Sequence, residues 1–419
     1  MRRFGEVFTT RGRAFISAGI TLMVCGYVLG FQDLSRVGVL LLGLPVLAGV
    51  LARRRPPGLV VTRTSDPAQM SAGEATTVTT TVANGDRRST PLMLAEEHLD
   101  HVLGERPRVM LGSLGAGDRR ALTYAVRPPL RGRHRLGPLT VQLRDPFGLT
   151  QRFVEAGEAT EVLVLPRVHA LGGSRPPGTG VGAEGEIPFM VALHGEDDQS
   201  IREYRDGDDL RRIHWPATAR TGELMVRQED RPARRRAVVL LDPRVDAHTG
   251  VGPSSSFEWA VSAAASMVVH LSDLGYAVHL LTPDTVGDGP DALPIEPAAA
   301  LAVLAVAQPD TGLALARLTR SALGLISGGG LLVAVLAAHD ESALRTLATL
   351  RRPGATALAM VLDTGSFAGK PAGHAVAAVD LLRGAGWRAT TVTRGDSVAG
   401  AWDEVGSRRD AALVSGAIR

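Results

Sequence analysis

The pattern of apolar and polar residues begins with two charge-free runs near the amino terminus. "AFISAGITLMVCGYVLGF" spans residues 14–31 and "VGVLLLGLPVLAGVLA" spans 37–52, with the short polar segment "QDLSR" between them. As helices they would reach roughly 27 and 24 Å at ~1.5 Å per residue, close to a hydrocarbon core of ~30 Å. We therefore expect a two-helix transmembrane hairpin over residues 1–55. A cleaved signal peptide is the alternative, but a second apolar run follows at once and no small-x-small site lies near Gly30.

A different pattern, with apolar and polar residues alternating, follows from residue 59 to about residue 167. "ATTVTTTVANGD" places Thr and Val at every second position and ends on an Asn-Gly turn, Asn84 and Gly85. Alternation of this kind between turn residues indicates antiparallel strands with one buried face. Several such runs predict a small β-sandwich of immunoglobulin-like kind over residues 56–168. No cluster of catalytic residue types occurs in this range.

The pattern changes again after about residue 168. Residues 170–190 are rich in Gly and Pro, which predicts a loop or linker over 169–200. Further on, apolar runs such as "AVVLLDP", "YAVHLLTPD", "GLLVAVLAA" and "ATALAMVLD" alternate with helical segments such as "SFEWAVSAAASMVVHLSDLG". Continuous apolar strands separated by helices predict a parallel, doubly wound α/β domain over residues 237–419.

Composition and charge narrow the classes of function. The 419-residue chain has a formal net charge of +3 and contains 4% aromatic residues. So small a basic excess does not indicate nucleic-acid binding, and the scarcity of aromatic residues disfavours binding by base stacking. The single cysteine, Cys25, lies inside the first apolar run. A single cysteine excludes a disulfide framework and a zinc site built on thiolates, and its place in the apolar run excludes a Cys–His hydrolase or transamidase, because a nucleophile in lipid cannot meet a soluble substrate.

The basic residues around the apolar runs predict the orientation of the hairpin. Arg2, Arg3, Arg11 and Arg13 precede the first run, and the arginines at 53–55 follow the second. Because cytoplasmic loops carry an excess of Lys and Arg, both termini are expected in the cytosol. The chain after the hairpin is then cytoplasmic, at the plasma membrane.

Two glycine-containing segments resemble nucleotide-binding loops but lack their essential features. "GSFAGKP" (365–371) has three residues between its glycines instead of four, and Pro371 stands where a magnesium-binding hydroxyl is needed. "GTGVGAEG" (178–185) follows no strand. We expect a surface turn and a linker at these places, and no cofactor.

Asp242 is the best candidate for a metal ligand, because it ends the first strand of the α/β pattern, where such folds place ligand groups. A divalent ion needs several oxygen ligands, and Asp246 and Asp340 could add to them. However, Arg244 would repel a cation, and Pro243 and Val245 supply no hydroxyl. We therefore expect no metal at this edge.

Residues 201–236 contain the highest density of side chains that could bind or catalyse, namely Arg, Asp, Glu, His, Tyr and Trp. "REYRDGDDLRRIHWPATARTGELMVR" contains His214 close to Asp208, a pair that could perform acid–base catalysis. No Ser or Cys nucleophile accompanies the pair, and arginines surround it. Ion pairing of those arginines with the neighbouring acids is favoured, with Tyr204 and Trp215 as a buried apolar anchor. The expected partner-binding or structural residues of this segment are Arg202, Glu203, Tyr204, Gly207, Asp208, Arg211, His214, Trp215 and Arg220.

These residues resemble the signature of the bacterial family called domain of unknown function 58 (DUF 58). The resemblance rests on Arg202-Glu203-Tyr204, Gly207-Asp208, Arg211, Ile213-His214-Trp215, Ala219-Arg220 and Gly222-Glu223-Leu224. Upstream, "RGRHRLGPLTVQLRDPFGL" (131–149) and "VLVLPRV" (162–168) are also typical of that family. With the apolar hairpin, the resemblance covers nearly the whole chain.

The resemblance implies a membrane-anchored protein with a cytoplasmic β-domain and a carboxyl-terminal domain like that of von Willebrand factor A. It also implies partners, since such proteins are commonly encoded beside MoxR-type AAA+ ATPases and transglutaminase-like membrane proteins. The chain departs from the Asp-x-Ser-x-Ser metal pattern of von Willebrand A domains, because Arg244 and Asp246 occupy the serine positions.

Two hypotheses of function follow. In the first, which we favour, the protein is a non-enzymatic scaffold or adaptor that presents residues 201–236 and the α/β domain to an ATPase at the membrane. In the second, it is a hydrolase or a metal-dependent binding protein that uses His214, Asp208 or Asp242.

Overall fold

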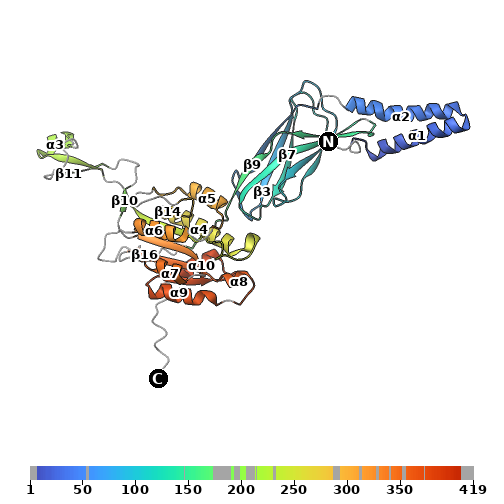
Figure 1. Ribbon diagram of the computed structural model, residues 1–419. Coiled ribbons are helices and arrows are strands. Elements are labelled where there is room, and N and C mark those ends of the chain that lie inside the picture. The colour runs from blue at the N-terminus through green and yellow to red at the C-terminus, as the bar shows by residue number, and fades with distance from the viewer. Residues whose placement is uncertain are drawn as a thin grey trace. The chain divides into compact units, whose positions relative to one another are not determined.

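A computed structural model describes residues 7–52, 56–145, 147–172, 190–192, 199–203, 213, 215–229, 233–285, 293–310, 314–326, 330–338, 341–351, 355–371 and 373–406. The chain forms two compact units, Met1–Leu165 and Pro166–Arg419. The first unit contains two long helices and two β-sheets, and the second is a mixed helix-and-sheet unit (Figure 1). Its helices and strands confirm the expected mixture of structural classes.

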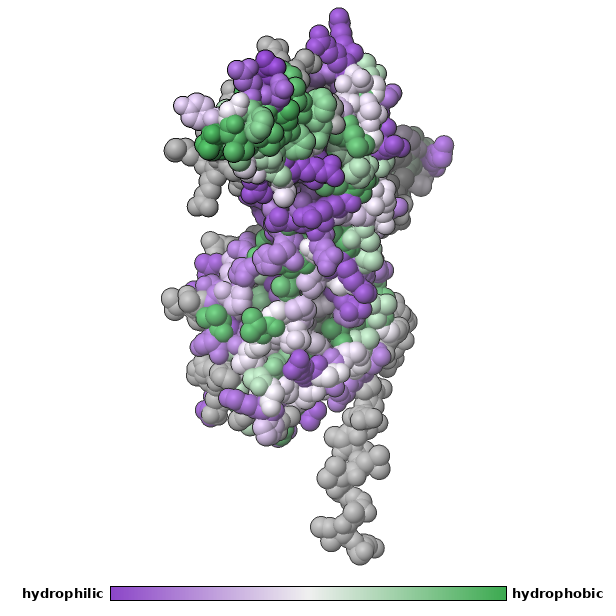
Figure 2. Space-filling model, turned by 90° about the vertical axis from the view of Figure 1, so that its right-hand side faces the viewer, coloured by the Kyte–Doolittle hydropathy of each residue, from purple (hydrophilic) through white to green (hydrophobic). Residues whose placement is uncertain are grey.

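The two charge-free runs form a helical hairpin. Helix α1 spans Thr10–Leu29 and helix α2 spans Gln32–Ala52 (Figure 1). The Thr9 hydroxyl caps α1 by accepting a hydrogen bond of 3.2 Å from the Gly12 N–H, and Gly30 ends the helix at a φ of +76°. Both helices are long and apolar enough to cross a membrane. Their outer faces are hydrophobic, which Figure 2 shows as a green area.

Glycines allow the two helices to approach closely. A Cβ atom on Gly38 would lie 2.8 Å from the Met23 nitrogen and 2.9 Å from the Gly19 carbonyl oxygen. A Cβ atom on Gly26 would lie 2.5 Å from the Ser35 hydroxyl oxygen. Close backbone contact through small residues is how apolar helices pack without a hydrophobic driving force between them. The hairpin is therefore specified by its glycines as well as by its length.

The alternating stretch forms two β-sheets that pack on each other. One sheet has the order β1-β3-β6, formed by Leu59–Asp66, Thr76–Asn84 and Arg119–Val126. The other has the order β2-β9-β7-β4-β5, formed by Met70–Ser71, Thr160–Leu165, Gly132–Arg144, Met93–Leu99 and Arg108–Leu111, and β8 (Gln151–Ala156) pairs with β7. Every second residue of β3 is buried, as expected for a strand with one face on the core.

The Asn-Gly turn has a different role from a hairpin turn. Strand β3, which ends at Asn84, pairs with β1 and β6, whereas the next strand, β4, belongs to the other sheet. The Asn84 side-chain amide donates hydrogen bonds to the carbonyl oxygens of Arg88 at 2.8 Å, Leu114 at 3.0 Å and Gly115 at 3.0 Å. Asn84 therefore ties together the loops at one end of the two sheets.

An ion pair that the alternation did not predict joins the two sheets. Arg63 of β1 lies 2.9 Å from Glu97 of β4, and their side chains are 3% and 0% exposed. Thr80 donates a hydrogen bond of 3.0 Å to the second Glu97 carboxylate oxygen. A buried pair of this kind is tolerable only because its polar atoms are well hydrogen-bonded.

The second unit is built on a sheet of parallel strands. Their order is β14-β13-β15-β16-β17, formed by Ala277–Leu281, Ala233–Leu241, Gly330–Ala337, Ala355–Leu362 and Arg388–Val392. Short β10 (Met190–Ala192) pairs antiparallel with the start of β13. Both β10 and the first residues of β11 (Gln199–Glu203) lie inside the range expected to be a linker.

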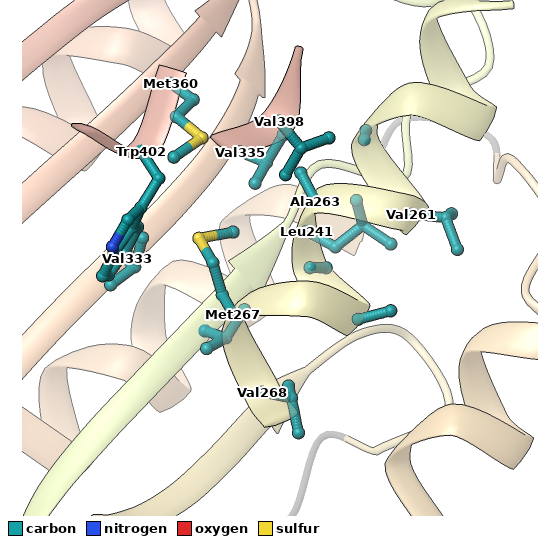
Figure 3. Packing of buried hydrophobic residues seen from close by; sticks show 14 of the residues in the cluster. Leu241, Val261, Ala263, Met267, Val268, Val333, Val335, Met360, Val398 and Trp402 are labelled. Atoms are coloured by element: carbon teal, nitrogen blue, oxygen red, sulfur yellow. The ribbon is translucent and has the colours of Figure 1, made fainter. Parts of the chain in front are cut away.

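Helices cover both faces of this sheet. Helices α4 (Ser256–Asp273), α5 (Pro297–Val306) and α10 (Val398–Gly406) share one core cluster with the strands. Helices α6 (Ala314–Ile326), α7 (Glu341–Ala348) and α9 (His374–Gly384) share the other. Figure 3 shows part of the first cluster, with Met267 of α4, Trp402 of α10 and Val333 of β15 among its labelled side chains. The apolar strand runs read from the sequence are the buried strands of this unit.

Candidate functional site

The segment that carries the family signature contains a β-ribbon and a short helix. Strand β11 pairs antiparallel with β12 (Met225–Glu229), so that Arg202 lies opposite Val226 and Glu203 opposite Met225. Helix α3 (Trp215–Thr221) lies between the two strands in sequence and carries Arg220 in its last turn. The Thr218 hydroxyl accepts a hydrogen bond of 3.0 Å from the Met225 N–H, which links α3 to β12.

Trp215 is exposed, which contradicts the prediction that it is a buried anchor. Its exposed fraction is 66%, and that of Leu224 is 43%. Arg220 is exposed as well. Trp215 is the first residue of a helix of two turns that has no buried residue, so this helix offers no core in which the indole could be enclosed. The exposure argues against an internal clamp at this residue.

The remaining signature residues, Tyr204, Gly207, Asp208, Arg211 and His214, lie outside the described residues. The expected pairing of arginines with acids, and the proposed acid–base pair of His214 and Asp208, therefore stay predictions.

Asp242 lies at the carboxyl end of β13, in the position read from the sequence. Its carboxylate is fully buried and accepts four hydrogen bonds. Three come from Arg244: from Nε at 2.9 Å and the backbone N–H at 3.2 Å to Oδ1, and from Nη2 at 2.7 Å to Oδ2. The fourth comes from the Ala337 N–H at 3.1 Å. Because a carboxylate offers about four acceptor positions, none is left over for a ligand.

Arg244 therefore stands where a cation would have to stand. Its side chain is 7% exposed, and Nη2 also donates a hydrogen bond of 3.3 Å to the Ala337 carbonyl oxygen. A guanidinium group that binds a carboxylate through two nitrogens supplies the positive charge and the geometry that a metal ion would otherwise supply. Among the described residues no group of three or more His, Cys, Asp or Glu is placed to hold a metal ion, and Asp340 lies outside them.

A serine–histidine pair that the sequence did not suggest lies at the same edge. His248 Nδ1 is 3.1 Å from the Ser256 hydroxyl, and Nε2 is 2.9 Å from the Asp242 carbonyl oxygen. Burial lowers the pKa of His248, and the Asp242 carbonyl and carboxylate oppose that shift. Ser256 is fully buried and its hydroxyl also accepts a hydrogen bond from the Thr249 N–H at 2.9 Å. A hydroxyl enclosed in this way cannot reach a substrate, so the pair holds the loop that follows β13.

The glycine-containing segment 365–371 forms a tight turn after β16. Asp363 caps the four-residue helix α8 (Thr364–Phe367), and Lys370 is exposed. The Ser366 hydroxyl donates to the Asp363 carbonyl oxygen at 2.6 Å. This arrangement agrees with a surface turn.

A small pocket opens beside the edge strand β14. It has a volume of about 180 Å³ and is lined mainly by apolar side chains, among them Leu281, Leu293 and Leu325. His279 lines it with 3% exposure, and burial, together with the charge of Arg236, lowers the pKa of His279 to about 4. Its imidazole is therefore neutral near pH 7.

The comparisons with known proteins agree with the resemblance in the signature segment. Residues 200–300 match the family model described as "Protein of unknown function DUF58". The match covers most of β11, all of α3, β12, β13, α4 and β14, and the start of α5, and it supports the DUF58 family. A comparison with curated proteins finds no match.

Solved structures similar to parts of the chain are distant. The CARDB domain of the PF1109 protein from Pyrococcus furiosus, crystallised with di-metal ions, has 22% identity and a TM-score of 0.20, over 26% of this chain and 89% of that domain. The Pseudomonas fluorescens alkylpurine DNA glycosylase AlkC has 15% identity and a TM-score of 0.19, over 32% of this chain and 38% of that one. Likeness at this level carries no inference about function.

Proposed function

We propose that this protein is a membrane-anchored adaptor that faces the cytoplasm and works with a MoxR-type AAA+ ATPase in the assembly or maturation of protein complexes. In this proposal the hairpin of α1 and α2 holds the chain in the plasma membrane, with both termini in the cytosol. The two-sheet domain is immunoglobulin-like and the α/β domain is similar to that of von Willebrand factor A. A transglutaminase-like membrane protein is a further partner.

The observation that carries the proposal is the exposure of Trp215 in the signature segment. Tryptophan is the residue type most enriched among those that dominate binding energy at protein interfaces. Here it stands at the start of α3 with 66% of its surface exposed, inside the range that the family model matches. Covering this side chain with a partner would remove apolar surface from water, which favours binding.

The polar groups at the carboxyl ends of the parallel strands support an adaptor function over an enzymatic one. Open α/β sheets bind ligands beyond the carboxyl ends of their strands. At this edge the Asp242 carboxylate is occupied by Arg244 and Ala337, and the Ser256 hydroxyl is enclosed. The described polar groups at the edge therefore stabilise the fold.

We expect Trp215→Ala to weaken binding of the ATPase about 30-fold or more, which corresponds to a loss of about 2 kcal/mol at an interface hot spot. The melting temperature should not change, because the side chain is already largely exposed. Co-purification of the ATPase from membranes, followed by titration of the purified partners, measures both quantities.

Val251→Ala is the matched control, because Val251 is 92% exposed and lies in the loop after β13, outside α3. Equal binding by Trp215→Ala and the wild type would refute the proposed surface. Loss of cellular function in His214→Gln and Asp208→Ala, with stability and ATPase binding intact, would instead support the hydrolytic or metal-dependent alternative.

A further inference from the structure

The turn between β7 and β8, of which residues 145 and 147–150 are described, is attached to the start of α1. The Thr9 N–H donates a hydrogen bond of 2.9 Å to the Leu149 carbonyl oxygen, and the Thr9 hydroxyl donates one of 2.6 Å to the Gly148 carbonyl oxygen. A Cβ atom on Gly12 would lie 2.1 Å from the Leu149 carbonyl oxygen, so only glycine permits this contact. The turn therefore lies directly against the first turn of the helix, although some 140 residues separate the two segments in sequence.

Hydrogen bonds to Asp145 make the turn rigid. Oδ1 accepts from the Phe147 N–H at 2.8 Å, and Oδ2 accepts from the Thr150 hydroxyl at 2.8 Å and from the Thr150 N–H. Gly148 has a φ of +67°, a conformation that favours glycine. The Phe147 side chain next to it is 56% exposed. The turn thus presents an aromatic ring to its surroundings from a fixed backbone.

The position of the turn along α1 fixes its depth relative to a membrane. Ala14, the first residue of the charge-free run, lies two residues after Gly12 and therefore about 3 Å further along the helix axis. If α1 crosses the bilayer, as the proposed function requires, Phe147 lies at the boundary between headgroups and hydrocarbon. Segments that lie in the membrane interface place Phe, Trp and Leu side chains at this boundary, with Lys and Arg on the polar side.

Positive charge surrounds this position. Arg11 and Arg13 are exposed in the first turn of α1, and Arg144 is exposed at the end of β7, next to the turn. In the part of the chain that the structure describes, no ion pair involves these three arginines. Guanidinium groups bind phosphate oxygens through two nitrogens, and the cytoplasmic leaflet carries anionic lipids.

We propose that the β7–β8 turn is a second membrane contact, separate from the spanning helices. Phe147 enters the headgroup region, and Arg11, Arg13 and Arg144 bind the phosphates of anionic lipids. The inference rests on the membrane anchoring in the proposed function and adds that the β-domain is held on the bilayer surface. A single exposed aromatic residue is common on soluble proteins, but here charge and depth both match a lipid interface.

The distribution of tryptophan allows a direct test. All four tryptophans of the chain, Trp215, Trp259, Trp387 and Trp402, lie in the second unit. The fluorescence of a tryptophan introduced into the first unit is therefore obtained by subtracting the fluorescence of the wild type. The full-length protein would be reconstituted in vesicles of anionic phosphatidylglycerol and phosphatidylcholine with brominated acyl chains, which quench tryptophan on contact.

We expect the brominated lipid to quench about half or more of the fluorescence that Phe147→Trp adds, as for a side chain buried 5–10 Å into the interface. Arg133→Trp is the control, because Arg133 lies eleven residues before Arg144 in β7, roughly 36 Å away at ~3.3 Å per residue. The fluorescence that Arg133→Trp adds should be the same in vesicles with and without bromine.

Val24→Trp separates the two possible failures, because Val24 lies in the middle of α1 with 52% exposure. Quenching at Val24 without quenching at Phe147 overturns this inference and leaves the membrane anchor intact. No quenching at Val24 overturns both the anchor and the inference.

The role of the arginines is tested in the same vesicles. Replacing phosphatidylglycerol by neutral lipid, or combining Arg11→Gln, Arg13→Gln and Arg144→Gln, should reduce the quenching of Phe147→Trp about twofold or more. Quenching that is the same in neutral and anionic vesicles would refute the binding of lipid phosphates. If the Phe147→Trp side chain is shielded from its surroundings only when a membrane protein is co-reconstituted, and is not quenched by brominated lipid alone, this surface binds a protein partner. That result would also overturn the inference.

Discussion

At the scale of single residues, two buried carboxylates are each paired with a guanidinium group. Asp242 pairs with Arg244 at the edge of the parallel sheet, and Glu97 pairs with Arg63 between the two β-sheets. Removing one partner of such a pair leaves an uncompensated charge in a low-dielectric interior, which costs more than the pair contributes when it is intact.

We therefore expect Arg244→Ala to lower the free energy of unfolding by about 3–5 kcal/mol. Arg108→Ala is the control, because Arg108 pairs with Glu96 at 2.9 Å but is 66% exposed, and exposed pairs contribute at most about 1 kcal/mol. Denaturant unfolding followed by circular dichroism measures both variants. Equal, small losses in the two variants would show that the buried Asp242–Arg244 pair stabilises the fold no more than an exposed pair does.

The same residue also separates the two hypotheses of function. If Arg244 occupies the place of a cation, the wild-type protein should show no saturable binding of magnesium or manganese in calorimetry. Low-micromolar binding that Asp242→Ala abolishes would contradict the adaptor proposal.

At the scale of elements, the helical hairpin depends on glycines at specific positions. Gly38 lies against the backbone of α1, whereas a Cβ atom on Gly43, in the same helix, would meet nothing within 4 Å. The two positions have the same residue type and the same helix but opposite surroundings. The same substitution therefore changes helix propensity equally at both positions, and only the contact between the helices differs.

We expect Gly38→Leu to separate α1 from α2 and Gly43→Leu to leave the hairpin intact. Cys25, the single cysteine of the chain, lies half-buried in α1 and serves as the probe. A membrane-permeant maleimide should modify Cys25 faster in Gly38→Leu, by roughly tenfold if the contact contributes about 1.4 kcal/mol. Equal rates in the two variants would show that the helices do not pack through Gly38.

At the scale of the whole molecule, histidine burial makes stability depend on pH. The pKa of His279 is lowered to about 4, from an ordinary value near 6.5. Between these values the unfolded chain binds a proton that the folded chain does not, so stability rises with pH in this range. The contribution of His279 is complete above pH ~6.5 and is lost as pH falls towards ~4.

We expect this loss to amount to at most about 3 kcal/mol, at 1.36 kcal/mol per pKa unit. His279→Leu should flatten the pH dependence of unfolding between pH ~6.5 and ~4. Tryptophan fluorescence is the measurement, because every tryptophan lies in the second unit. His98→Gln, on β4 of the first unit, should leave that pH dependence unchanged. If the free energy of unfolding changes with pH equally in His279→Leu and the wild type, His279 is not the source of the pH dependence.

The sequence by itself determined the features that depend on local periodicity. Two charge-free runs of spanning length became α1 and α2, and the alternation of "ATTVTTTVAN" became β3 with every second residue buried. The apolar runs that start at Ala237, Gly330 and Ala355 became buried parallel strands, because a strand covered on both faces must be apolar throughout. The same reasoning placed Asp242 directly after the end of β13.

Only the tertiary structure decided which side chains meet. Trp215 was expected in a core and is exposed, because the pattern of a short helix does not reveal whether another element covers it. The hydrogen bond from the Ala337 N–H to Asp242, the pairing of Arg63 with Glu97 and the contact of Gly12 with Leu149 join groups that lie far apart in the sequence. Their geometry follows from how sheets and helices pack over long sequence distances, and a periodic pattern contains no information on that packing.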